Sequence, residues 1–161
     1  MKKILLFIGF VYSFILIACN NEKEKTQDND TTQSANAPAK ISNTIEITAN
    51  DSMKFSTIEL NVKAGEKVTL TFKNVGTAPK ASMAHNWILL KDNTDLDAFA
   101  REAGTAPDYI PVDNPNILAH TKLLGPGESD TIEFTVPPGP YMFVCSFPTH
   151  MKTMLGILTA S

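Results

Sequence analysis

The sequence predicts an all-β fold, a Greek-key sandwich or barrel of about seven to eight strands with one short helical insertion. Short segments alternate apolar with polar residues, as a half-buried strand does, and residues 68–75 (VTLTFKNV) show this most clearly. Turn-forming residues separate these segments, for example at 125–127 (GPG) and 137–140 (PPGP). A single stretch, residues 95–103, combines good helix formers with an acidic start and a following glycine.

The individual strands follow from the same patterns. Residues 44–47 alternate at period two, and residues 55–62 form a second extended stretch whose slips in alternation we attribute to a bulge. A turn at 62–67 leads into the strand at 68–75. Residues 87–90 (WILL) are continuously apolar, which is typical of a buried strand. After the helical insertion, the expected strands cover residues 131–136, 141–145 and 155–159.

Length and composition limit the function classes. At 161 residues the chain allows one domain rather than two. Hydrophobic residues make up 43%, which argues against wholesale disorder, and a formal charge of −3 argues against a nucleic-acid-binding protein. Two cysteines, Cys19 and Cys145, are too few for a disulfide framework or a cysteine-rich zinc site.

The N-terminus predicts export. Lys2 and Lys3 precede fifteen uncharged residues, a pattern typical of a secretory signal peptide, which we assign to residues 1–18. This apolar run is shorter than the roughly 20 residues of a membrane-spanning helix, although an uncleaved anchor helix is the alternative. Its end, LIAC at residues 16–19, resembles a bacterial lipobox, which implies cleavage before Cys19 and lipid attachment to that residue.

A polar segment follows the predicted lipidation site. Residues 19–43 are rich in Asn, Thr, Gln, Asp and Lys, a composition that cannot bury enough apolar surface to fold alone. We expect a flexible tether that joins the lipid to one β-rich domain at residues 44–161. The mature protein would be lipid-anchored on the periplasmic face of a bacterial membrane or at the cell surface. Cys145 would have no disulfide partner there, so burial, reactivity or a metal must account for it.

Three potential metal ligands lie close together near the C-terminus. Cys145, His150 and Met154 fall within ten residues, and Pro148 stops the strand that ends at Cys145, so the loop can turn these side chains towards one point. His85, just before a buried apolar strand, can supply a fourth ligand. Two imidazoles, one thiolate and a weak thioether form a blue-copper ligand set, whereas zinc prefers a carboxylate or water as its fourth ligand.

These residues lie in segments that resemble azurin, a blue-copper family related to the auracyanins. The matching segments are residues 84–87 (AHNW), 119–125 (AHTKLLG) and 141–150 (YMFVCSFPTH), with the spacing Cys-x4-His-x3-Met. The resemblance covers nearly the whole predicted domain and implies a cupredoxin fold with one copper ion. It implies His85, Cys145 and His150 as equatorial ligands. Met154 would be the axial ligand, and the backbone carbonyl of Ala84 a weak second axial contact.

The resemblance also implies roles for residues around the ligands. Asn86 would brace the ligand loop by hydrogen bonds near Cys145 and Ser146, and Ser146 and Phe147 would lie around the ligands. The chain departs from the azurin pattern at Ala84 and Thr149, where azurins usually carry glycine. The disulfide that azurins usually have near the N-terminus is also missing.

Apolar residues flank the expected ligand loop. We expect Met83, Pro148, Thr149 and Met151 to form an apolar docking patch around the exposed edge of His150, with scattered surface apolarity as the alternative.

Each ligand candidate also has an ordinary alternative, because a single buried Cys or Met most often only packs in a core. Four such residues at this spacing favour copper instead. We expect His120 to be a non-ligand near the surface and Trp87 to be a core residue.

The expected function is single-electron transfer by a type 1 copper site. The partners would be redox proteins, such as cytochromes or terminal reductases and oxidases. The four ligands leave no open position for a substrate, so no enzyme is expected, and the chain is expected to be a monomer. The main alternative is a copper-delivery lipoprotein, although delivery favours exposed Met/His sites. A copper-free domain used in adhesion is a third possibility, against which the intact ligand set argues.

Overall fold

The computed structural model describes residues 40–161. The predicted signal peptide, the lipidation site at Cys19 and most of the predicted tether lie outside the described residues. Within residues 40–161, no helix has both the length and the apolar character needed to cross a membrane.

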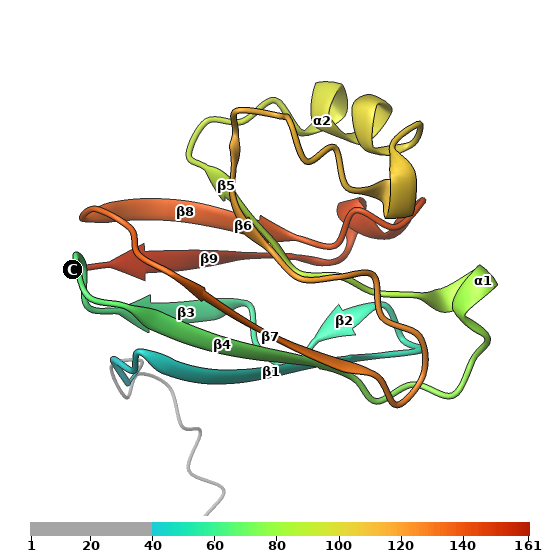
Figure 1. The fold of residues 1–161 in the computed structure, drawn as a ribbon, viewed down its shortest axis with the longest axis horizontal. Coiled ribbons are helices and arrows are strands. Elements are labelled where there is room, and N and C mark those ends of the chain that lie inside the picture. The colour runs from blue at the N-terminus through green and yellow to red at the C-terminus, as the bar shows by residue number, and fades with distance from the viewer. Residues whose placement is uncertain (1–39) are drawn as a thin grey trace, which may run out of the picture. The chain divides into compact units, whose positions relative to one another are not determined.

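Two β-sheets make up the fold (Figure 1). The four-stranded sheet has the order β2 (Lys54–Phe55), β1 (Thr44–Asn50), β4 (Val68–Asn74) and β7 (Ser129–Phe134). The five-stranded sheet has the order β3 (Glu59–Val62), β9 (Leu155–Ala160), β8 (Gly139–Val144), β5 (Ile88–Lys91) and β6 (Ile117–His120). The β1–β4 and β3–β9 pairs are parallel and the others antiparallel. This two-sheet sandwich confirms the predicted fold class.

The number of strands is nine rather than seven to eight. The extended stretch expected at 55–62 is two strands, because β2 ends at Phe55 and β3 begins at Glu59 in the other sheet. The slips in its alternation therefore mark a crossing between sheets, and the expected bulge was wrong. The other addition is β6, which the sequence pattern did not indicate.

The helical insertion is confirmed as α2 (Leu96–Ala103). The Asp95 carboxylate accepts hydrogen bonds from the backbone N–H groups of Asp97 and Ala98, and the N–H of Gly104 donates to the carbonyl of Ala100. These contacts satisfy backbone groups at both ends of the helix. Three single-turn elements were not expected: α1 (Lys80–Met83) and the 3-10 turns η1 (Pro107–Tyr109) and η2 (His150–Lys152).

The core has two parts, and β5 contributes to both. Trp87 and Leu89 face the interior between the sheets, where Trp87 is fully buried as expected. Ile88 and Leu90 point to the other face of their sheet, where they pack with Phe99 of α2. This arrangement explains the continuous apolar run at 87–90, because both faces of the strand are covered. Burial of a side chain such as Phe99 contributes about 1.5–3 kcal/mol, which fixes α2 on the sheet.

The domain begins at an open edge between β1 and β3. Ser42 donates its backbone N–H to the carbonyl of Asn61 (3.0 Å), and Lys63 donates its N–H to Oδ1 of Asn43 (2.8 Å). These bonds join the edges of the two sheets. The C-terminus lies beside them, since Ala64 donates its N–H to the carbonyl of Ser161 (3.0 Å).

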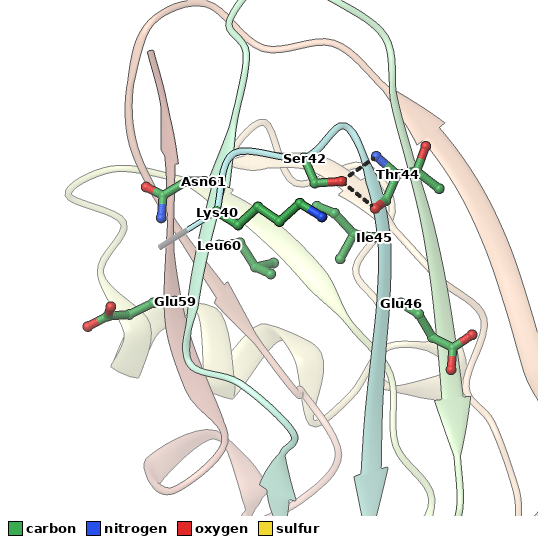
Figure 2. Close-up of a pocket in the computed structure, with 8 residues that line it drawn as sticks. All are labelled: Lys40, Ser42, Thr44, Ile45, Glu46, Glu59, Leu60 and Asn61. Atoms are coloured by element: carbon green, nitrogen blue, oxygen red, sulfur yellow. Dashed lines mark hydrogen bonds between the residues drawn. The ribbon is translucent and has the colours of Figure 1, made fainter. Parts of the chain in front are cut away.

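A groove with a volume of about 240 Å³ follows this edge, and Figure 2 shows it between β1 and β3. The Ser42 hydroxyl accepts a hydrogen bond from the N–H of Thr44 (3.3 Å) and donates to its carbonyl (2.7 Å). Just before β3, the Thr57 hydroxyl makes the same pair of bonds to Glu59, the first residue of that strand (3.3 and 3.0 Å). None of the predicted metal ligands lines this groove.

Candidate metal centre

Three of the predicted ligands come together at the end of the domain remote from the C-terminus. Sγ of Cys145 lies 4.0 Å from Nδ1 of His85 and 3.7 Å from Nδ1 of His150. All three ligand atoms lie within 4.8 Å of one another, and all three residues are buried. Nitrogen and sulfur ligands at about 2.0–2.3 Å from one ion, at trigonal angles, are about 3.7 Å apart. The donor set therefore fits one metal ion held by three ligands.

Backbone hydrogen bonds hold each ligand in place. His85 lies just before β5, and its N–H donates to the carbonyl of Leu124 (3.0 Å), while the Leu124 N–H donates back (2.8 Å). Cys145 follows β8, and its N–H donates to the carbonyl of Met154 (3.0 Å). The N–H of Met154 in turn donates to the carbonyl of His150 (2.8 Å). The loop from Cys145 to Met154 is therefore closed at its base.

The predicted axial positions are buried nearby. Met154 and Ala84 are both 0% exposed and belong to the same core cluster as Cys145. Water is thereby kept from this side of the site, and a thioether is available in an apolar environment.

Asn86 is joined to Ser146 by two hydrogen bonds. Its Oδ1 accepts from the Ser146 N–H (2.8 Å), and its Nδ2 donates to the Ser146 hydroxyl (2.8 Å). The Phe147 ring lies 4.8 Å from the His150 ring, measured between centroids.

Sequence reasoning missed two residues around this network. The Ser146 hydroxyl donates to the carbonyl of Tyr109 (2.6 Å), and the backbone N–H of Trp87 donates to the Thr121 hydroxyl (3.0 Å). Thr121 lies in the AHTKLLG segment already singled out, so that segment was the available signal. Nothing in the sequence pattern indicated Tyr109.

Burial keeps the metal-free ligands neutral. It raises the pKa of the Cys145 thiol to about 11, against hydrogen bonds from the backbone at Asn86 and Phe147. Burial lowers the pKa of His150 to about 4, and repulsion from His85 adds to this effect. Burial also lowers the pKa of His85, opposed by the backbone of Asn50 and the charge of Asp51. Neutral imidazoles have free lone pairs, and the thiol must release its proton when a metal binds.

One nitrogen of His85 has no polar partner of good geometry. Its Nε2 is buried, and no group of residues 40–161 makes a hydrogen bond to it within normal geometry. The same ring has its Nδ1 facing Cys145. The ring is therefore oriented for metal ligation through Nδ1.

The predicted docking residues differ in how far they are exposed to solvent. Pro148 and Thr149 are exposed and Met83 is half-buried. The prediction for Met151 was wrong, because this side chain is 8% exposed and packs in the cluster beneath α2. The η2 turn directs it towards the helix, a contact between segments distant in the chain. His150 is only 2% exposed, so it offers much less surface than expected.

Thr149 and His120 both lie close to the ligand segments without belonging to the ligand cluster. Thr149 adopts a left-handed conformation, with φ at 72°, that glycine adopts without strain. The departure from glycine that the sequence analysis noted at this position therefore falls on a residue whose backbone conformation favours glycine. His120 is half-buried on β6, with Nδ1 3.1 Å from the carbonyl of Thr121, and is not part of the ligand cluster.

Comparisons with known proteins give a consistent result. A family model described as copper-binding proteins of the plastocyanin/azurin family matches residues 40–161. An azurin of Achromobacter denitrificans is 38% identical over 122 residues, which cover 71% of this chain and 82% of that protein. The outer membrane protein H.8 of Neisseria gonorrhoeae is 39% identical over 120 residues, 70% of this chain and 64% of that protein.

Solved structures agree with these sequence relatives. Reduced auracyanin from Roseiflexus castenholzii is similar with a TM-score of 0.68 and 40% identity. The match covers 76% of this chain and 99% of the auracyanin chain. An azurin from Methylomonas sp. strain J has a TM-score of 0.68 and 28% identity, covering 78% of this chain and 99% of that one.

Proposed function

The chain belongs to the plastocyanin/azurin family of copper-binding proteins, and we propose that His85, Cys145 and His150 are the equatorial ligands of its copper. Together with its azurin and auracyanin relatives, the candidate site makes the chain a blue-copper electron carrier with one copper ion. The observation that carries the proposed ligand set is the approach of the Cys145 sulfur to both imidazole nitrogens, at 4.0 and 3.7 Å.

Copper supplies a one-electron couple between Cu(I) and Cu(II). The thiolate of Cys145 and the thioether of Met154 suit Cu(I), while the imidazoles of His85 and His150 suit Cu(II). The protein holds these ligands by backbone hydrogen bonds in a buried site, so one geometry serves both oxidation states. A fixed geometry favours rapid electron transfer, because little rearrangement accompanies the change of charge.

We propose Met154 as the axial ligand and the carbonyl of Ala84 as a weak opposite contact. Their complete burial next to Cys145 supports this assignment. Met154→Leu should keep the blue colour and change the reduction potential, since the axial ligand tunes the potential. Loss of the blue band in this variant would contradict the proposed role.

Proteins of this family carry electrons and are generally not enzymes, and redox proteins are their partners. For this chain we propose docking at the end that carries Met83, Pro148 and Thr149, next to His150, with the chain acting as a monomer. Cytochromes or terminal reductases and oxidases are the proposed partners. The burial of the site disfavours copper delivery, because a metal held by ligands that are at most 2% exposed exchanges slowly.

We propose that the chain is exported and anchored by lipid on Cys19. The lipobox-like LIAC sequence supports this, as does the similarity to a protein named for the outer membrane. Mass spectrometry of the full chain purified from bacterial membranes should find Cys19 at the N-terminus with attached lipid. Cys19→Ser should release the protein into the soluble fraction. An unmodified Cys19 in the membrane fraction would contradict the anchor.

The domain of residues 40–161 is suited to the main test, because the solved auracyanin chain consists almost entirely of the matching part (99%). After addition of Cu(II), we expect an intense blue thiolate-to-copper absorption band and a small copper hyperfine splitting in electron paramagnetic resonance. Both should vanish on reduction and in Cys145→Ser. His120→Ala is the matched control and should keep both signals. Bound copper without the band, or a band that persists in Cys145→Ser, would overturn the proposed ligand set.

A further inference from the structure

A strained turn follows α2 and touches the metal loop. Asp108 and Tyr109 both adopt left-handed backbone conformations, with φ at 50° and 58°. Non-glycine residues avoid this region because Cβ meets the backbone, and a residue stays there only where its surroundings fix it. Within residues 40–161, this is the only adjacent pair of such residues that are not glycine.

Tyr109 contacts the two residues that follow Cys145. Its carbonyl accepts a hydrogen bond from the Ser146 hydroxyl, and at 2.6 Å this bond is short. Its ring meets the Phe147 ring edge-on, with centroids 5.2 Å apart and planes at 76°. The left-handed conformation therefore places a carbonyl and a ring of one residue against consecutive residues of the metal loop.

These contacts continue to the ligands. Ser146 is bonded through both its N–H and its hydroxyl to Asn86, the residue after His85. Phe147 lies 4.8 Å from the His150 ring between centroids. Tyr109 thus reaches the neighbourhood of His85, Cys145 and His150 through two contacts.

The rest of the α2 insertion has its own attachment to the domain. Phe99, Ala103 and Ile110 are at most 6% exposed and pack in the cluster on the outer face of the five-stranded sheet. The insertion therefore does not depend on Tyr109 to stay in place. The Tyr109 contacts instead hold Ser146 and Phe147 of the metal loop.

We infer that the Asp108–Tyr109 turn, which we name the Tyr109 clamp, is a positioning device that holds the Cys145–His150 loop in its ligand geometry before and after electron transfer. The inference rests on the proposed function for its redox consequence. Its structural part, a loop held in place without metal, stands apart from that function. The Tyr109 turn holds the loop from outside the two segments that carry the ligands, and a loop held in this way rearranges less when the charge at the site changes.

Tyr109→Ala removes the ring and weakens the clamp, and Tyr109→Phe is the matched control because the phenol hydroxyl takes no part in the contacts. In the copper-free domain, we expect amide hydrogen exchange over residues 146–154 to be about tenfold faster in Tyr109→Ala. Amides of β4 should keep their rates. Tyr109→Phe should match the unaltered protein in both regions.

In the copper-loaded domain, Tyr109→Ala should increase the copper hyperfine splitting and slow electron self-exchange about tenfold. Tyr109→Phe should match the unaltered protein in both measurements. Ser146→Ala is a second variant, which removes the donor to Tyr109 but keeps the backbone bond to Asn86. It should accelerate exchange over the same loop.

Equal acceleration over β4 and the loop would overturn the clamp, since it would show a role in global stability only. Unchanged exchange and unchanged self-exchange in Tyr109→Ala would overturn it as well. Failure of the proposed function is distinguishable, because the unaltered domain would then lack the blue band. The hydrogen-exchange comparison would still decide the structural part.

Discussion

The two ends of the sandwich are stabilised by different means. At the metal end, polar side chains are buried, and six of the seven buried polar residues of the described chain lie there. They are Asn74, His85, Asn86, Thr121, Ser146 and His150. At the far end, near Ser42 and the C-terminus, the polar side-chain contacts lie at the surface and include exposed ion pairs such as Lys67–Glu133 (3.0 Å).

This difference decides what each end tolerates. A buried polar group that loses its partner stays desolvated, so each hydrogen bond at the metal end matters individually. Exposed groups at the far end regain water when a partner is lost. Substitutions of polar residues should therefore destabilise the domain strongly at the metal end and only weakly at the far end.

The largest difference is expected when an asparagine is replaced by alanine at each end. Asn86→Ala should lower the free energy of unfolding of the copper-free domain by about 3 kcal/mol, because it leaves buried groups of Ser146 unpaired. Asn43→Ala removes a comparable bridge from half-buried Asn43 to Lys63 and should cost about 1 kcal/mol. Denaturant titration of both variants measures the difference. Equal losses would remove the distinction between the ends.

The metal end should also make stability depend on pH. The pKa of His150 is lowered to about 4 from 6.5, so above pH 6.5 both the folded and the unfolded copper-free protein hold a neutral imidazole. As the pH falls from about 6.5 to about 4, His150 becomes protonated in the unfolded state but stays neutral in the folded state. Stability should therefore decrease across this window, by on the order of 2 kcal/mol. Thermal melts of His150→Asn should show a flatter dependence, and an unchanged slope would exclude His150 as its source.

Two turn residues with nearly the same positive φ should give smaller effects, of opposite sign to each other. Thr149 has φ at 72° at the metal end, and Gly65 has φ at 73° at the far end. Thr149→Gly should raise the free energy of unfolding by about 1 kcal/mol, because strain is relieved. Gly65→Ala should lower it by about 1 kcal/mol through conformation alone, since an added Cβ has open space there. Calorimetry of both variants tests the pair, and shifts of equal sign would refute it.

The smallest effect is expected for the exposed ion pair at the far end. The side chains of Lys67 and Glu133 are 64% and 54% exposed, so Lys67→Ala should change the free energy of unfolding by less than about 0.5 kcal/mol. Denaturant titration at low and high salt should find nearly equal values for the variant and the unaltered domain. A loss near that of Asn86→Ala would contradict the comparison.

The sequence predicted the parts of the fold that depend on local pattern. Alternation identified β1 and β4, and an acidic cap with a following glycine identified α2. The ligand spacing predicted which residues meet, because it combined an unusual donor set with a recognisable family pattern. Residues 1–39 lie outside the described chain, so the lipid anchor and tether remain proposals.

The features that sequence reasoning missed arise from contacts between distant segments. The crossing at residues 56–58 looked like a bulge, since alternation alone does not say which sheet a strand joins. Met151 looked exposed because its burial depends on α2, about fifty residues earlier in the chain. Tyr109 gave no signal because one of its contacts is made by a backbone carbonyl, which every residue has, and the other joins its ring to Phe147 in a distant segment.

The hydroxyl bonds along the open edge have a consequence for association between chains. An exposed strand edge recruits other strands through its free N–H and C=O groups, and this is how β proteins begin to aggregate. The first residues of β1 and β3 are Thr44 and Glu59, and their backbone N–H and C=O groups are already bonded to the hydroxyls of Ser42 and Thr57. Where many copies are crowded together, these two edges are therefore closed to strand pairing between molecules at those two positions.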